Sequence, residues 1–97
     1  MKSYIISYDL INGGDYDALT SEIEAISQVE AWHCLESVWI INSNLSASEI
    51  NKKLIAKLDE DDRIIVSQIH GPNTSWRKTF SEKCRNWLKT NLCPVES

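Results

Sequence analysis

The chain contains few residues whose type and position suggest catalysis, and Asp9 is the first of them. It follows a segment rich in tyrosine and isoleucine, so its carboxylate lies at the end of a predicted strand. A carboxylate at such a place is costly if it is buried without a partner. It could hold a divalent cation such as Mg²⁺, which prefers oxygen ligands. The competing interpretation is that Asp9 caps the turn at Asn12-Gly13.

A second polar cluster comprises His33, Cys34 and Ser37. Cysteine and histidine can form a nucleophile–base pair. Neighbouring residues on a strand point to opposite faces, however, which argues against such a pair here. His33 could instead act as a general acid or base near Asp9, or it is an ordinary surface histidine. We take Asp9, His33 and Ser37 as the candidate catalytic residues and Asp9 as the candidate metal ligand.

Other groups that often mark functional sites have simpler interpretations here. The cysteines are Cys34, Cys84 and Cys93, an odd number, and no CxxC pair is present. We therefore expect three reduced thiols, with neither a disulfide framework nor a zinc site. The acidic run at 59–62 lacks the spacing of a calcium-binding EF-hand and is predicted to be a solvated loop.

The elements that must position these residues can be recognised along the chain. Segments rich in β-branched and aromatic residues predict four strands, at 3–10, 29–35, 38–41 and 63–69. Apolar residues at helical spacing predict three helices, at 15–27, 47–58 and 76–91. Ser46 and Glu49 fit a capping box at the start of the second helix.

This order of elements predicts an α+β domain with a ferredoxin-like βαββαβ core, a four-stranded antiparallel sheet and an additional C-terminal helix. Residues 1–72 form the core, and residues 73–97 form a linker and a basic amphipathic helix. Because both core helices pack on one face of the sheet, the other face needs a cover. We expect the C-terminal helix or a second subunit to lie there. The residues expected on that face are Ile5, Ser7, Asp9, Ile65, Ser67 and Ile69.

Charge is distributed unevenly along the 97 residues, whose net charge is −4. Residues 1–76 carry five basic and twelve acidic side chains, whereas residues 77–97 carry five basic and two acidic ones. The acidic body argues against a dedicated nucleic-acid binder, but the basic, aromatic tail could bind single strands or a protein partner. The candidate partner-binding residues are Trp76, Phe80, Trp87, Arg77, Lys83 and Arg85. The alternative is that the apolar members of this set pack onto the core with the basic side chains outward.

The sequence also limits where the protein is expected. The N-terminal segment does not have the pattern of a secretion signal. No stretch approaches the roughly 18 apolar residues of a membrane span. We therefore expect a cytoplasmic protein that does not associate with a membrane.

Four short motifs lie within roughly residues 3–70: Tyr8-Asp9-Leu10, Trp32-His33, Ser37-Val38-Trp39 and Asp61-Asp62. In their order and spacing they resemble those of the Cas2-like proteins, which include the VapD-type toxins. The closer similarity is to a branch of short Cas2-like proteins. The resemblance implies a homodimer with opposed sheet faces and with Asp9 near the two-fold axis. In nuclease-type members, two such aspartates would hold one divalent cation, whose bound water could attack a phosphodiester.

The sequence departs from the Cas2 pattern at two places. Val38-Trp39-Ile40-Ile41 stands where those proteins usually have Val-Phe-Glu-Gly, and the first turn is Asn12-Gly13-Gly14-Asp15 in place of an arginine-rich one.

Two candidate functions remain. The first is a Mg²⁺-dependent endonuclease, specifically an endoribonuclease. The alternative is a non-catalytic dimeric module that binds a protein or a nucleic acid, with the C-terminal helix as its interaction element.

Overall fold

The computed structural model describes residues 1–11, 15–77 and 80–94, which form a four-stranded antiparallel sheet, three α-helices and one 3-10 turn. In chain order the elements are β1 (Lys2–Asp9), α1 (Tyr16–Ile26), β2 (Trp32–Leu35), β3 (Val38–Ser43), α2 (Ala47–Ile55), β4 (Arg63–Ile69), η1 (Gly71–Asn73) and α3 (Glu82–Asn91). The strand order is β2-β3-β1-β4. The predicted α+β class and the antiparallel four-stranded sheet are therefore confirmed.

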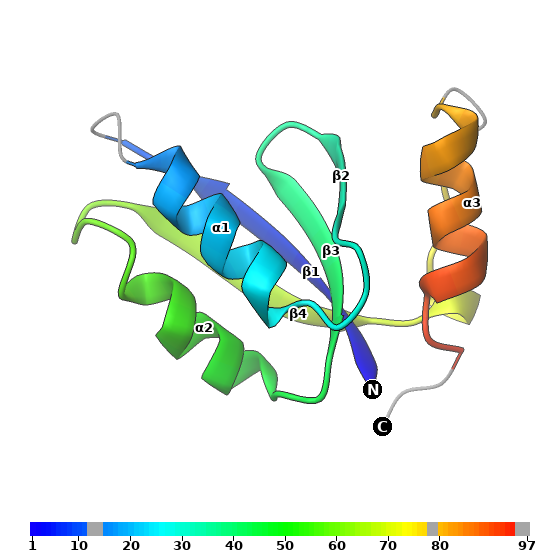
Figure 1. The fold of residues 1–97 in the computed structure, drawn as a ribbon, viewed down its shortest axis with the longest axis horizontal. Helices are drawn as coiled ribbons and strands as arrows, with labels where there is room; N and C mark the ends of the chain where they lie inside the picture. Colours follow the sequence, from blue (N-terminus) through cyan, green and yellow to red (C-terminus); the bar gives the residue numbers. More distant parts are fainter. Residues whose placement is uncertain (12–14, 78–79, 95–97) are drawn as a thin grey trace.

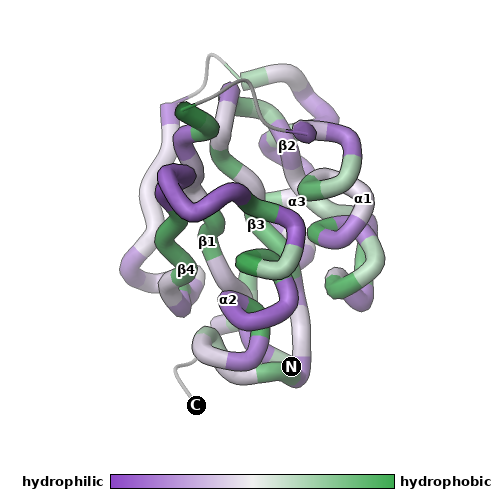
Figure 2. The backbone as a smooth tube through the Cα atoms, turned by 90° about the vertical axis from the view of Figure 1, so that its left-hand side faces the viewer, coloured by the Kyte–Doolittle hydropathy of each residue, from purple (hydrophilic) through white to green (hydrophobic). Residues whose placement is uncertain are grey.

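The helices divide between the two sides of the sheet. Figure 1 shows α1 and α2 next to each other over one face, with α3 standing apart from them beyond β2. In Figure 2, apolar residues appear as green segments along β1, β3 and β4. No helix in the described part of the chain is long and apolar enough to cross a membrane.

Side-chain caps mark the starts of α1 and α2. Asp15 accepts a hydrogen bond from the Ala18 amide at 3.0 Å at the start of α1. The capping box of α2 is present as predicted: Ser46 Oγ accepts from the Glu49 amide, and Glu49 Oε1 accepts from the Ser46 amide, each at 3.1 Å. The hydrogen bond from the Ser46 amide lowers the pKa of the Glu49 carboxyl because it stabilises the charged form.

The largest boundary error lies in the C-terminal helix. α3 begins at Glu82 and not at residue 76, because Ser81 caps it by accepting a hydrogen bond from the Cys84 amide at 3.3 Å. Residues 78–79 of the predicted helix lie outside the described residues. So does the predicted Asn12-Gly13-Gly14 turn, and with it the interpretation of Asp9 as its cap.

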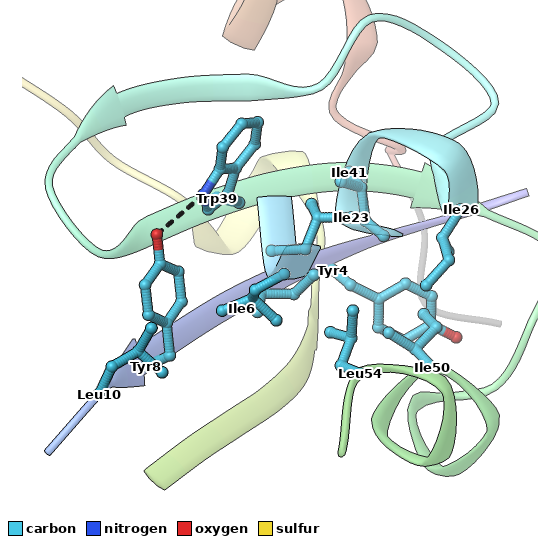
Figure 3. Packing of buried hydrophobic residues seen from close by; sticks show 11 residues of the cluster. Tyr4, Ile6, Tyr8, Leu10, Ile23, Ile26, Trp39, Ile41, Ile50 and Leu54 are labelled. Carbon is cyan, nitrogen blue, oxygen red and sulfur yellow. Dashed lines mark hydrogen bonds between the residues drawn. The ribbon is translucent and has the colours of Figure 1, made fainter. Parts of the chain in front are cut away.

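The larger apolar cluster lies between the sheet and the helices α1 and α2. Tyr4, Ile6 and Tyr8 alternate along β1 and point into it. Figure 3 shows these side chains packed against residues of α1, β3 and α2. Trp39 Nε1 donates a hydrogen bond to Tyr8 Oη at 3.2 Å, and the Tyr4 hydroxyl donates to the Leu45 carbonyl at 2.7 Å. The polar atoms of both buried tyrosines therefore have partners.

A second apolar cluster lies on the opposite face, where α3 packs. Its buried members are Trp32, Ile40, Trp87 and Leu88, and Trp76 and Phe80 pack against them. The strand register places Val38, Ser7 and Ile65 in one row and Ile40, Ile5 and Ser67 in the next. The interpretation in which the apolar residues of the tail pack onto the core is thus confirmed. α3 covers the β2–β3 side of this face, whereas Ile65 on β4 remains 63% exposed.

Candidate functional site

Asp9 lies at one end of the sheet, on the last residue of the central strand β1. Its side chain is exposed and points away from the cluster that holds Tyr8, because successive strand residues alternate between faces. The register places Arg63 of β4 directly opposite. Both residues line a shallow depression of about 260 Å³, together with Ser7 and the exposed Ile65. This place therefore combines a carboxylate, a guanidinium and an apolar floor.

The acidic loop at 59–62 holds this end of the sheet together. Asp62 Oδ1 accepts a hydrogen bond from the Ile11 amide at 3.0 Å, and its Oδ2 accepts from the Asp59 amide at 2.9 Å. The half-buried Asp62 thus ties the segment after β1 to the loop before β4. The segment 59–62 is a loop, as predicted, in which residues 59–61 are exposed and Asp62 is half-buried. Among the described residues, no group of three or more histidine, cysteine or acidic side chains could hold a metal ion.

His33 does not lie beside Asp9. Its ring stacks on Trp39 with centroids 3.9 Å apart and an interplanar angle of 15°. Trp39 belongs to the cluster under α1 and α2, so His33 is on the sheet face opposite to Asp9. The structure therefore gives no support to His33 as an acid or base for chemistry at Asp9.

Ser37 lies in the tight turn between β2 and β3. It adopts a left-handed backbone conformation with φ of 57°, which is uncommon for a residue other than glycine. Its carbonyl accepts a hydrogen bond from the Tyr8 amide at 3.1 Å. The backbone of Ser37 is thus next to the end of β1, one residue from Asp9.

The predicted partner-binding residues have contacts within the chain. Trp87 is buried, and Trp76 and Phe80 are partly buried in the second cluster. Lys83 Nζ lies 3.1 Å from Glu30 Oε1, and Arg85 Nη1 donates to the Phe80 carbonyl at 3.0 Å. Arg77 is exposed. While α3 is docked, Trp87 is not available to a partner, whereas Trp76 and Phe80 are only partly covered.

A larger cleft of about 370 Å³ lies between β2 and α3. Its walls include Trp32, Trp39 and Trp87, with Glu30 and Lys83 at its edge. Cys34 of β2 and Cys84 of α3 line the same cleft and are joined by a disulfide, with their Cα atoms 6.3 Å apart. The expectation of three reduced thiols was therefore wrong, and only Cys93 is free.

Sequence reasoning missed this disulfide because the cysteines are 50 residues apart and have no recognisable spacing. Their proximity follows only from the docking of α3 across β2. The one available signal was the position of Cys84 on the apolar side of the predicted helix, which had to face the strands if that helix covered the sheet.

No protein-family model, curated protein or solved structure matches the chain. The resemblance to the Cas2-like proteins therefore stays a prediction.

Proposed function

We propose that the chain is a Cas2-like domain with a ferredoxin-like core, which forms a homodimer in the cytoplasm and cuts RNA with the help of Mg²⁺ at Asp9. The strand order β2-β3-β1-β4, with α1 and α2 both on one face, supports the ferredoxin-like assignment because split βαβ units produce this order. The four sequence motifs support the family.

The observation that carries the proposal is the position of Asp9. It is an exposed carboxylate at the end of the central strand, on the part of the sheet that α3 leaves open. Ile65 lies on the same part and is 63% exposed. A second copy placed against this surface would bury Ile65 and would bring two Asp9 side chains toward one another.

The donor set fits Mg²⁺ only when two chains contribute. One chain offers a single carboxylate at this place, whereas Mg²⁺ is commonly held by one or two carboxylates together with waters and substrate phosphates. Two Asp9 residues would meet that requirement. When bound, Mg²⁺ supplies a Lewis acid and an activated water. Arg63, opposite Asp9, can hold a phosphate oxygen pair through its planar guanidinium.

A second candidate is a dimeric module that binds a partner without cutting it. The position of His33 favours it, because His33 lies on the sheet face opposite to Asp9 and cannot transfer a proton there. The net charge of −4 also favours it over an enzyme that must approach a polyanion. Its contact surface would be the open part of the sheet and the exposed basic residues of the tail, such as Arg77.

The test is a cleavage assay on labelled RNA and DNA with Mg²⁺ or Mn²⁺. We expect cation-dependent cutting of RNA by the wild type and its loss in Asp9→Asn, which keeps the size of the side chain but removes its charge. Asp17→Asn, at an exposed acid of α1, is the matched control and should cut normally. Absence of cutting by the wild type, or equal cutting by all three proteins, would contradict the nuclease and leave the binding module.

The dimer is tested separately by sedimentation velocity. We expect the wild type to sediment as a dimer and Ile65→Glu to sediment as a monomer, because a charge at the centre of the interface would be buried without a partner. Ile55→Glu, at a similarly exposed isoleucine on α2, is the control and should remain a dimer. A monomeric wild type would contradict both candidate functions in their dimeric form.

A further inference from the structure

The disulfide between Cys34 and Cys84 lies at a cleft, not in the interior of the core. Both cysteines are partly exposed and line the cleft of about 370 Å³ between β2 and α3. Purely structural cysteines are usually inert because they are buried, whereas reactive ones are partly exposed. An external thiol can therefore reach this bond from solvent.

α3 is also held in place without the disulfide. Trp32 Nε1 donates to the carbonyl of Cys84 itself at 3.2 Å, which fixes the backbone of one cysteine to the strand that carries the other. Trp87 Nε1 donates to the Glu30 carbonyl at 2.5 Å, and Lys83 pairs with the Glu30 side chain. The apolar residues Trp87 and Leu88 are buried beneath the helix. These contacts join α3 to β2 and to Glu30 in addition to the disulfide.

The two cysteines differ in their surroundings. Cys84 is in the first turn of α3, three residues after the Ser81 cap. The backbone amides of a first helical turn favour a negative charge nearby. Lys83 is its neighbour, although Glu82 in the same turn and Glu30 opposite reduce the effect of that cation. Cys34 is on β2 and has no helix terminus behind it. A thiolate is therefore better stabilised on Cys84, which makes Cys84 the better leaving group.

We propose that Cys34 and Cys84 form a reversible dithiol–disulfide couple that exchanges with an external thiol at the cleft between β2 and α3. The incoming thiolate attacks Cys34 Sγ, a new S–S bond forms there, and Cys84 departs as a thiolate. A second external thiolate then attacks the sulfur of the first external thiol in that mixed disulfide, and Cys34 departs as a thiolate. The external thiols leave as a disulfide, and Cys34 and Cys84 are left reduced, each with one proton. The reverse sequence restores the bond.

Cys93 does not belong to this couple. It follows the C-terminal end of α3, and a helix rising 1.5 Å per residue separates it from Cys84 by more than about 10 Å. Its sulfur donates to the Met1 carbonyl at 3.4 Å. Cys93 therefore provides an internal reference, because its thiol should react in the oxidised and the reduced protein alike.

The first experiment is a redox titration of the folded protein. The chain is equilibrated with mixtures of reduced and oxidised dithiothreitol, its free thiols are alkylated, and they are counted by mass spectrometry. We expect a reversible change from one free thiol to three, with unchanged circular dichroism and tryptophan fluorescence maxima. Cys93→Ser should give the same two-thiol change, from none to two. A thiol count that changes only when the protein unfolds would overturn the proposal, as would a count of three under fully oxidising conditions.

The second experiment tests the assigned roles and the source of the thiol. In the Cys93→Ser background, Cys34→Ser leaves Cys84 as the only thiol, and Cys84→Ser leaves Cys34. We expect Cys84 to react with oxidised glutathione about tenfold faster than Cys34. Equal rates, or a faster Cys34, would overturn the direction of attack. Reduction of the wild type by glutathione or by a single-cysteine peptide at equal thiol concentration then distinguishes a small thiol from a protein cysteine.

Discussion

Ser3 Oγ donates a hydrogen bond of 2.6 Å to Asn42 Oδ1 across β1 and β3, on the sheet face that α3 covers. Both side chains are fully or almost fully buried. Asn42 Nδ2 donates to the Asn91 carbonyl at the end of α3, and Ser3 Oγ accepts from the Cys93 amide at 2.9 Å. Two strand residues thus satisfy backbone groups of the C-terminal segment, which shows that this segment is part of the domain and not an appended tail.

Replacing Asn42 by alanine should loosen the end of α3. The change removes the donor to the Asn91 carbonyl and the acceptor of the Ser3 O–H, although Ser3 Oγ still accepts from the Cys93 amide. An unsatisfied buried group costs about 1 to 3 kcal/mol. We expect a loss of unfolding free energy of about that size, measured by urea denaturation. Asn44→Ala, at an exposed asparagine two residues away, should change the unfolding free energy by less than about 0.5 kcal/mol. Equal effects of the two variants would contradict the role of Asn42.

The bond between Trp39 and Tyr8 provides a second stability test. Tyr8→Phe keeps the ring but removes the acceptor of Trp39 Nε1, which is in a buried site. We expect a loss of about 1 to 2 kcal/mol of unfolding free energy in thermal or urea denaturation. Tyr16→Phe is the control, because Tyr16 is 47% exposed and its ring packs near Tyr8 without taking part in that bond. If Tyr8→Phe is as stable as the wild type, the bond does not contribute.

The capping box of α2 predicts how stability depends on pH. The pKa of Glu49 is lowered in the folded chain because the Ser46 amide donates to its carboxylate. Its stabilising effect is therefore fully present above the unfolded pKa of about 4.3 and is lost as the pH falls through the lower folded pKa. Glu49→Gln retains an acceptor for the Ser46 amide but cannot titrate. The unfolding free energy of this variant should therefore fall less steeply with decreasing pH than that of the wild type.

The profile is measured by urea denaturation between pH 2 and pH 7, a range chosen to span the ordinary carboxyl pKa values. Glu24→Gln, which removes an exposed charge from α1 in the same way, is the control and should keep the slope of the wild type. If both variants show the same slope as the wild type, Glu49 does not account for the acid sensitivity.

The left-handed backbone at Ser37 predicts a stabilising substitution. The positive φ of 57° costs a residue with a side chain about 1 kcal/mol, and glycine avoids that cost at some loss of chain entropy. We expect Ser37→Gly to raise the unfolding free energy by about 0.5 kcal/mol and the melting temperature by a few degrees. Ser37→Ala retains the Cβ atom and should give no such gain. The same pair of variants in the cleavage assay tests whether the Ser37 hydroxyl takes part in any reaction.

The sequence was most informative where one local signal was sufficient. The Ser46–Glu49 capping box and the alternation along β1 depend on neighbours in the chain, and they predicted real features. The start of α3 at Glu82 was harder to predict, because Trp76 and Phe80 continue the apolar spacing although they precede the cap. They pack against the sheet from irregular backbone, which periodicity alone does not distinguish from a helix.

The candidate site depended on relationships that periodicity does not contain. One of the two interpretations of His33 placed it near Asp9, but the strand alternation that places Tyr8 under the helices also places Asp9 on the face opposite to His33. The other interpretation, an exposed surface histidine, agrees with the structure. The pairing of Cys34 with Cys84 required the position of α3 on β2, which depends on the buried Trp32 and Trp87. Such tertiary contacts are determined by the packing of the whole chain.

The disulfide also divides the polypeptide topologically. Cys34 and Cys84 close a covalent loop that contains β3, α2 and β4, whereas β1 and α1 belong to an N-terminal arm outside it. β1 nevertheless lies between β3 and β4. A protease cut in the exposed stretch 59–61 would leave one covalent molecule under non-reducing conditions, while a cut between β1 and α1 would free β1. β1 is therefore the strand that a separate synthetic peptide could replace, since its two neighbours remain linked without it.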